Sequence, residues 1–128
     1  MAMNVFDIMG PIMVGPSSSH TAGAVRIGFT ARQLLREEIK HVKLYLHGSF
    51  LATGKGHGTD KALIAGLLGM KPDDERIPYS FQYAKECGLD YEFLGIELRN
   101  AHPNSVLIKL EGIKGNKLEL VASSVGGG

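Results

Sequence analysis

Apolar residues recur in the first third of the chain at the spacing of an amphipathic helix. The recurring positions are Ala24, Ile27, Ala31, Leu34 and Leu35, with Arg26, Arg32 and Arg36 distributed among them. Because a helix turns once in about 3.6 residues, this spacing places the apolar side chains on one face. The pattern predicts one long helix from about residue 19 to residue 38.

Four later segments alternate between apolar and polar residues, as half-buried strands do. They are HVKLYLHG (41–48), YEFLGIEL (91–98), SVLIKLEG (105–112) and KLELVASS (117–124). The turn-rich IKGN between the last two predicts an antiparallel hairpin. An apolar arm, residues 5–14, precedes them all, but Gly10, Pro11 and the following Pro16 argue against a central strand there. We expect this arm to be ordered and partly buried.

Two shorter helices are predicted between the strands. One follows the glycine-rich loop of TGKGHGTDKALIAGLLG (53–69), with Thr59 as its N-cap and Asp60 in its first turn. The other is IPYSFQYAKECG (77–88), with Gly88 just past its end and Cys87 expected to be an inert buried thiol. The predicted fold class is therefore α+β, a single domain over residues 1–128. Its mixed or antiparallel sheet of about four strands packs against helices.

Composition narrows the function. The 128 residues are 44% apolar, enough for one packed core, and the formal net charge is only +1. So balanced a charge offers no basic surface for nucleic acid. No apolar run approaches the roughly 20 residues of a membrane span and no secretory signal is evident, so we expect a cytoplasmic protein. A single cysteine cannot hold a structural zinc ion or an iron–sulfur cluster, so the ligands of any such metal must come from another chain.

The stretch GPSSSHTAG (15–23) is the first candidate for chemistry, because it opens the predicted long helix. Unpaired N–H groups and the dipole at a helix start favour an anion, and hydroxyl groups add donors. Between Asp7 and Glu37 there is no acidic residue, although helix starts commonly carry one. A ligand carboxylate would supply the absent charge. Serines at helix starts are also ordinary caps, but three serines followed by His20 and Thr21 exceed what a cap requires.

Two further stretches are weaker candidates. GKGHGT (54–59) combines three glycines, which let a backbone approach a ligand, with Lys55 and His57, but it is neither a Walker A loop nor a dinucleotide fingerprint. A mobile glycine loop is an equally good interpretation. HPNS (102–105) fixes a turn through Pro103 and presents His102 and Asn104, which turns also favour without any ligand. These residues alone name no reaction.

Three stretches resemble the beta chain of the bacterial iron–sulfur L-serine dehydratase, also called L-serine deaminase. They are FDIMGPIMVGPSSSHTAGAVRIG (6–28), GSFLATGKGHGTD (48–60) and HPNSV (102–106). The resemblance implies conversion of L-serine to pyruvate and ammonia together with an alpha chain. That alpha chain would ligate a 4Fe-4S cluster, without pyridoxal phosphate. It also implies similarity to the allosteric substrate-binding domain of some phosphoglycerate dehydrogenases. The glycine-rich tail, residues 124–128, would be a linker to an ACT domain that this sequence lacks.

The resemblance and the acid-free helix start together suggest roles for the candidate residues. His20 and His57 are the candidate catalytic groups, since imidazole is suited to carrying a proton near neutral pH. The candidate substrate-binding residues are Ser17, Ser18, Ser19, Thr21, Lys55, His102 and Asn104. No metal ligand is expected in this chain, and the isolated domain is expected to be inactive.

Two rival hypotheses stay open. In one, the domain is a non-catalytic regulatory module that binds serine or another small anion by itself. In the other, the loops form an assembly surface and the chain makes a homodimer without any ligand. Activity only on mixing with a cysteine-bearing partner would distinguish the enzyme subunit from both.

Overall fold

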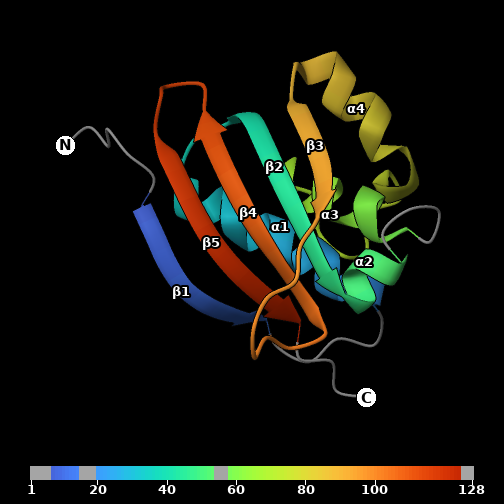
Figure 1. Ribbon diagram of the computed structural model, residues 1–128. Coiled ribbons are helices and arrows are strands. Elements are labelled where there is room, and N and C mark those ends of the chain that lie inside the picture. Colours follow the sequence, from blue (N-terminus) through green and yellow to red (C-terminus); the bar gives the residue numbers. More distant parts are fainter. Residues whose placement is uncertain (1–6, 15–19, 54–57, 125–128) are drawn as a thin grey trace.

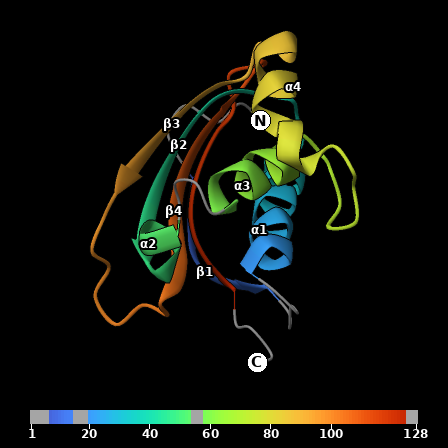
Figure 2. The same ribbon diagram turned by 90° about the vertical axis from the view of Figure 1, so that its right-hand side faces the viewer.

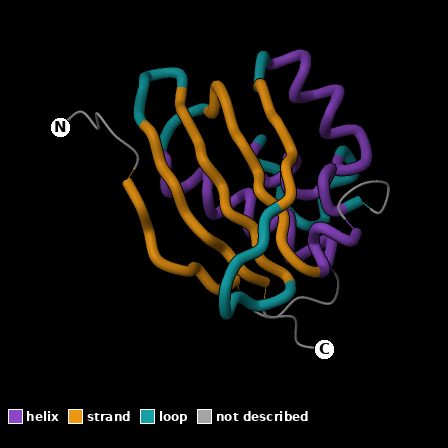
Figure 3. The backbone as a smooth tube through the Cα atoms, viewed as in Figure 1, coloured by secondary structure: helices purple, strands orange, loops and turns teal. Residues whose placement is uncertain are grey.

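A five-stranded sheet in the order β1-β5-β4-β2-β3 forms one layer of the fold (Figures 1 and 3). The computed structural model describes residues 7–14, 20–53 and 58–124. In chain order the elements are β1 (Asp7–Val14), α1 (His20–Leu35), β2 (Ile39–Gly48), α2 (Ser49–Thr53), α3 (Thr59–Leu67), the 3-10 helix η1 (Ile77–Tyr79), α4 (Ser80–Cys87), β3 (Asp90–Gly95), β4 (Asn104–Gly112) and β5 (Lys117–Ser124).

The sheet is mixed. Strand β4 runs antiparallel to both β2 and β5, whereas β2 pairs in parallel with β3, and β1 pairs in parallel with β5. The predicted hairpin is the β4–β5 pair, in which Glu111 lies opposite Lys117. The predicted α+β class, with a mixed sheet packed on helices, is thereby confirmed.

All the longer helices lie on one side of the sheet, as the view along its plane shows (Figure 2). The side chains of β2 alternate accordingly. Val42, Leu44 and Leu46 are buried beneath the helices, whereas Lys43 and Tyr45 point to the other face. Among the described helices, none has the length and apolar character that crossing a membrane requires.

The face that these helices leave uncovered carries a row of apolar side chains. Tyr45 of β2 lies opposite Leu94 of β3 and Leu107 of β4, and Leu107 lies opposite Val121 of β5. All four are half-buried rather than exposed. The next row toward the hairpin turn is charged, with the sequence Glu92, Lys43, Lys109, Glu119 across the same strands. The charges in this row sum to zero.

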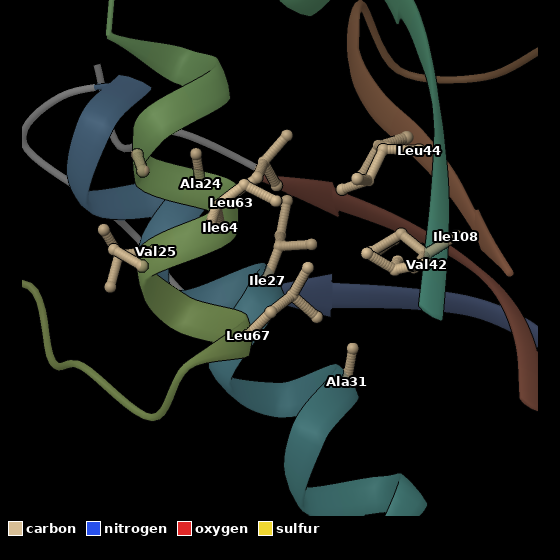
Figure 4. Packing of buried hydrophobic residues seen from close by; sticks show 14 of the residues in the cluster. Ala24, Val25, Ile27, Ala31, Val42, Leu44, Leu63, Ile64, Leu67 and Ile108 are labelled. Carbon is tan, nitrogen blue, oxygen red and sulfur yellow. The ribbon is translucent and has the colours of Figure 1, made fainter. Parts of the chain in front are cut away.

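Helices α1 and α3 cross at two glycines, Gly28 and Gly66. A Cβ atom added to Gly28 would lie 2.8 Å from the Leu67 nitrogen and 3.0 Å from the Gly66 Cα atom. One added to Gly66 would lie 2.6 Å from the Phe29 nitrogen. These contacts are too short for any real side chain, so the two backbones pack directly against each other. Between this crossing and the sheet lie the buried side chains of the core, including Ile27, Leu63, Leu67, Leu44 and Ile108 (Figure 4).

Glu37 ties the end of α1 to the β4–β5 turn. Its carboxylate accepts hydrogen bonds from the Lys114 backbone nitrogen at 2.7 Å and from Asn116 Nδ2 at 2.5 Å. Gly112 leaves room for the Glu37 side chain, because a Cβ atom added to Gly112 would collide with the carboxylate. The hairpin turn is therefore held against the helix layer.

The fifth strand is the segment predicted as an ordered arm. Residues Asp7–Val14 form β1 at the edge of the sheet, with a break in register between Met9 and Ile12. Pro11 lies within that break. Proline lacks a backbone N–H and is tolerated at edges and irregularities. The segment is thus a strand, but not a central one.

Two local predictions were wrong. Helix α3 begins one residue earlier than expected, with Gly58 as its N-cap at φ 91° and no side-chain cap, so Thr59 lies inside the helix and is buried. Glycine adopts this left-handed conformation without strain. Cys87, expected to be buried, is exposed. It is the last residue of α4, where Lys85, Glu86 and Gly88 are exposed as well.

Candidate functional site

The described residues that flank the three candidate motifs lie at one end of the sheet. Strands β1, β2, β3 and β5 finish there, and β4 begins there, since Val14 lies opposite Ser124 and Gly48 opposite Asn104. We call this the site end; it is at the bottom of Figure 1. The motif at 15–19 follows β1, the motif at 54–57 follows α2, and HPNS leads into β4. Ligands commonly bind at the carboxyl ends of parallel strands.

Two helices start at the site end with their first turns side by side. A Cβ atom added to Gly58, the N-cap of α3, would lie 3.9 Å from Thr21 Oγ1 in the first turn of α1. The first turn of α1 holds no acidic residue, as the sequence predicts, whereas that of α3 holds Asp60. The positive end of the α1 dipole therefore lacks a carboxylate from its own first turn.

Residues 102–105 form a turn fixed by several hydrogen bonds. The Asn104 backbone nitrogen donates to His102 Nδ1 at 3.0 Å, and Ser105 Oγ donates to the His102 carbonyl at 2.5 Å. Pro103 accepts a hydrogen bond from the Ser49 nitrogen at 2.8 Å. Gly48, at φ 60°, allows this approach, because an added Cβ would lie 2.9 Å from the Pro103 Cα atom. The turn is therefore fastened to the end of β2 and the start of α2.

The turn leaves two polar groups available. His102 Nδ1 is occupied as an acceptor, so in the neutral ring the proton is on Nε2, which can act as a donor. Asn104 Oδ1 is buried and has no hydrogen-bond partner among the described residues. A buried acceptor without a donor costs about 1–3 kcal/mol. Asn104 is therefore suited to accept a hydrogen bond from a ligand.

The other candidates are described only in part. Ser17, Ser18, Ser19, Lys55 and His57 lie outside the described residues. His20 is the first residue of α1, but its side chain lies outside the description too. Thr21, half-buried, and His102 with Asn104 are the candidate side chains that the structure places, all of them at the site end.

The sequence patterns assign no role to His47 and do not reveal the contact between Ser105 and Ser123. His47 Nδ1 accepts a hydrogen bond from the Leu98 nitrogen at 3.0 Å, which positions the segment after β3. The buried hydroxyls of Ser105 and Ser123 lie 2.6 Å apart. Their contact depends on strand register, so no local signal could have found it; for His47, the only signal was its place at a strand end.

The described residues do not fit a metal cluster. They include no group of three or more histidine, cysteine, aspartate or glutamate side chains that could hold a metal ion. Cys87, the one cysteine of the chain, precedes β3 and therefore lies at the end of the sheet opposite the site end. An iron–sulfur cluster needs several thiolates, which this sequence cannot supply.

Comparison with known proteins gives consistent matches. The chain is similar to the L-serine dehydratase beta chain of Peptoniphilus asaccharolyticus, at 51% identity over 126 residues, which cover 98% of this chain and 57% of that protein. The probable L-serine dehydratase beta chain of Bacillus subtilis is 50% identical, with coverage of 98% and 56%. L-serine dehydratase 2 of Escherichia coli is 48% identical over 77 residues, 56% of this chain and 16% of that protein.

The chain thus spans a little over half the length of these two beta chains. A family model described as serine dehydratase beta chain matches residues 4–90, which include β1, α1 and α3 and the motifs at 15–23 and 54–59. By this match and by the two beta chains that are about half identical to it, the chain belongs to the serine dehydratase beta chain family.

Proposed function

We propose that this chain orients the substrate in an L-serine ammonia-lyase, together with an alpha chain that carries a 4Fe-4S cluster. The reaction removes the α-proton and the hydroxyl of L-serine as water, and the resulting enamine hydrolyses to pyruvate and ammonia. The described residues that flank the three motifs lie at the site end, beside two helix starts, and this arrangement carries the proposal. The names of the relatives, L-serine dehydratase beta chain, support it.

The substrate carboxylate is assigned to the start of α1. That helix start has no acidic residue in its first turn, and the adjacent start of α3 adds a second positive dipole end. Ser17, Ser18, Ser19 and Thr21 would donate hydrogen bonds to the carboxylate, and Lys55 would add a positive charge. Only Thr21 of these is placed by the structure.

The substrate ammonium group is assigned to Asn104. Its buried Oδ1 has no partner among the described residues, and an ammonium N–H would satisfy it. His102 would donate from Nε2 to a substrate oxygen and not to the ammonium group, because its Nδ1 already accepts from the Asn104 backbone nitrogen. This arrangement favours a binding role for His102 over that of a proton acceptor.

The proton acceptor is assigned to His20 or His57. Neither imidazole is placed by the structure, but His20 begins α1 and residue 57 directly precedes the N-cap of α3. Both therefore belong to segments that adjoin the proposed carboxylate site. Either one could accept the α-proton of serine if the substrate is held between the two helix starts.

The test is reconstitution with the alpha chain under anaerobic conditions, with pyruvate formation as the readout. Asn104→Ala should lower kcat/KM about 10- to 100-fold, mainly through KM, because it removes one charge-assisted hydrogen bond of about 1.5–3 kcal/mol. Gln82→Ala, which removes an exposed amide from α4, is the matched control and should keep wild-type kinetics. An Asn104→Ala enzyme with unchanged kinetics rejects the ammonium assignment.

The same mixture separates the subunit hypothesis from a regulatory module. A subunit forms pyruvate only when both chains are present, and binds L-serine weakly alone. A regulatory module binds L-serine alone, which calorimetry on this chain would detect, and adds no activity on mixing. Absence of pyruvate from a mixture that contains an intact cluster would overturn the proposed function.

A further inference from the structure

A cavity of about 280 Å³ lies at the end of the sheet opposite the site end. Helices α1, α3 and α4 finish there, β2 begins there, and the β4–β5 turn adjoins it. In Figure 1 this is the upper end, where β3 starts and the hairpin turns. At the ~30 Å³ that a water molecule occupies in the liquid, the cavity has room for about nine such molecules. It is the size of a single small metabolite.

The floor of the cavity is apolar. Leu67, Met70 and Leu89 line it, and all three are buried members of the core. Cavities with apolar walls and a few polar groups at the mouth are the usual form of small-molecule sites. The floor would accept an aliphatic or aromatic group.

The mouth carries charges of both signs. Glu38, Lys40 and Arg32 line it. Among the described residues, neither the Glu38 carboxylate nor the Lys40 ammonium group has a hydrogen-bond or ion-pair partner. Arg32 donates from Nη1 to the Leu67 carbonyl at 3.2 Å, which fixes its guanidinium and leaves other N–H groups. Arg76 also lines the cavity, but its charge is met by Asp74 at 2.7 Å.

This combination selects one class of ligand. An anion alone would face Glu38, a cation alone would face Arg32 and Lys40, and a wholly apolar molecule would bury these charges without partners. A zwitterion meets both signs. The ends of three helices present the negative side of their dipoles here, which favours an ammonium group near Glu38.

We propose that this cavity binds a free amino acid with an apolar side chain. The ammonium group pairs with Glu38, the carboxylate pairs with Lys40 and Arg32, and the side chain lies on Leu67, Met70 and Leu89. The site is separate from the proposed substrate site and does not depend on it, since the two occupy opposite ends of the sheet.

The chain contains a built-in reporter of occupancy. Cys87 is its one cysteine, is exposed, and lines the cavity. The experiment follows the rate at which an aromatic disulfide reagent modifies Cys87 in this chain alone, with L-leucine as the probe. The rate should fall about tenfold when L-leucine is at about ten times its Kd, because only the empty fraction reacts. Without an alpha chain there is no turnover, so the result is independent of the proposed function.

Three matched ligands test the chemistry. Isocaproate lacks the ammonium group, isoamylamine lacks the carboxylate, and glycine lacks the side chain. Each should protect Cys87 at least tenfold more weakly than L-leucine. If glycine protects Cys87 as well as L-leucine does, the apolar floor does not bind the side chain. If isocaproate or isoamylamine protects as well as L-leucine does, the cavity does not require a zwitterion.

Substitutions at two exposed residues of the cavity mouth test their proposed roles in binding. Glu38→Gln and Lys40→Gln should each raise the Kd for L-leucine about tenfold, whereas Glu92→Gln and Lys71→Gln, also exposed but outside the cavity, should leave it unchanged. Circular dichroism checks that every variant is folded. A modification rate that is independent of L-leucine at every concentration in the wild-type chain would overturn the proposal, as would unaltered binding in both cavity variants.

Discussion

Ser105 Oγ lies 2.6 Å from Ser123 Oγ across β4 and β5, and it also donates to the His102 carbonyl at 2.5 Å. A hydroxyl has one proton and the carbonyl has none, so Ser123 must be the donor to Ser105. The two buried serines thus form a chain of hydrogen bonds that ends on the turn carrying His102 and Asn104. The pairing of β4 with β5 is in this way connected, at the site end itself, to the turn at residues 102–105.

The first prediction concerns this chain. Ser105→Ala should lower the free energy of unfolding by about 1–3 kcal/mol, because it leaves the Ser123 hydroxyl and the His102 carbonyl without their partner. Ser123→Ala should cost less, because Ser105 still donates to His102. Urea denaturation of the two variants gives the comparison. A larger loss in Ser123→Ala than in Ser105→Ala would contradict the assigned direction.

The second prediction concerns Glu37, which accepts hydrogen bonds from the Lys114 nitrogen and from Asn116 Nδ2. Glu37→Ala should destabilise the fold by about 1–2 kcal/mol and speed hydrogen exchange at the Lys114 amide, because the turn loses its charged acceptor. Glu86→Ala on the exposed side of α4 is the control and should change neither quantity. Unaltered exchange at Lys114 in the Glu37 variant would show that the carboxylate does not hold the turn.

The third prediction concerns acid. The Arg76 guanidinium, with further help from the Arg76 backbone N–H, lowers the pKa of Asp74 from 3.8 to about 2. Because the folded-state pKa is depressed, the stability from this pair is fully present above about pH 4 and is lost as the pH falls toward 2. An NMR titration of the Asp74 carboxyl carbon should have its midpoint near 2.

Arg76→Gln should move that midpoint upward toward 3.8, although only part of the way, because the backbone N–H at residue 76 still donates at 2.8 Å. Lys71→Gln removes a charge from the same surface turn without touching the pair and should leave the midpoint where it is. An Arg76→Gln variant whose Asp74 midpoint stays near 2 would rule out the side chain as the cause.

The fourth prediction concerns the helix crossing. Gly28→Ala should destabilise the fold by about 3 kcal/mol, since the new methyl meets backbone atoms of α3 that cannot rotate away. Gly88→Ala separates packing from backbone strain, because Gly88 has φ 80° but nothing within 4 Å of an added Cβ. It should cost only about 1 kcal/mol. Thermal or urea unfolding measures both, and equal losses would argue against the close crossing.

Local patterns predicted most of the elements. The alternation in KLELVASS predicts a strand over 117–124, and β5 is Lys117–Ser124. The apolar spacing from Ala24 to Leu35 predicts a helix, and α1 is His20–Leu35. In both cases one face of the element is buried against its neighbour, so the hydrophobic period carries the information.

Contacts between distant segments were beyond the reach of these patterns. The arm around Pro11 becomes a strand only because the edge of β5 is available to it. Gly58 replaces Thr59 as N-cap because the chain must turn through a left-handed conformation to enter α3. Cys87 was assigned to the core by the habits of its residue type, whereas the surface it occupies is set by how α4 packs.

Of the candidate site, too, one part follows from the sequence pattern and another depends on contacts between distant segments. The acid-free helix start was visible between Asp7 and Glu37 in the sequence, and α1 confirms it. Asn104 Oδ1 has no partner among the described residues, and the sequence could not predict this, because it depends on the atoms that surround the side chain in the fold. The roles proposed for the candidate residues all stay predictions: Ser17, Ser18, Ser19, His20, Thr21, Lys55, His57, His102 and Asn104.

Because nothing but hydrogen separates the α-carbons of Gly28 and Gly66 from the opposing backbone, the two backbones themselves set the spacing between α1 and α3 at that crossing. Any molecule held jointly by their first turns would therefore sit in a gap whose width is set several residues away. A substitution at either glycine would act at a distance, widening that gap without touching what it holds.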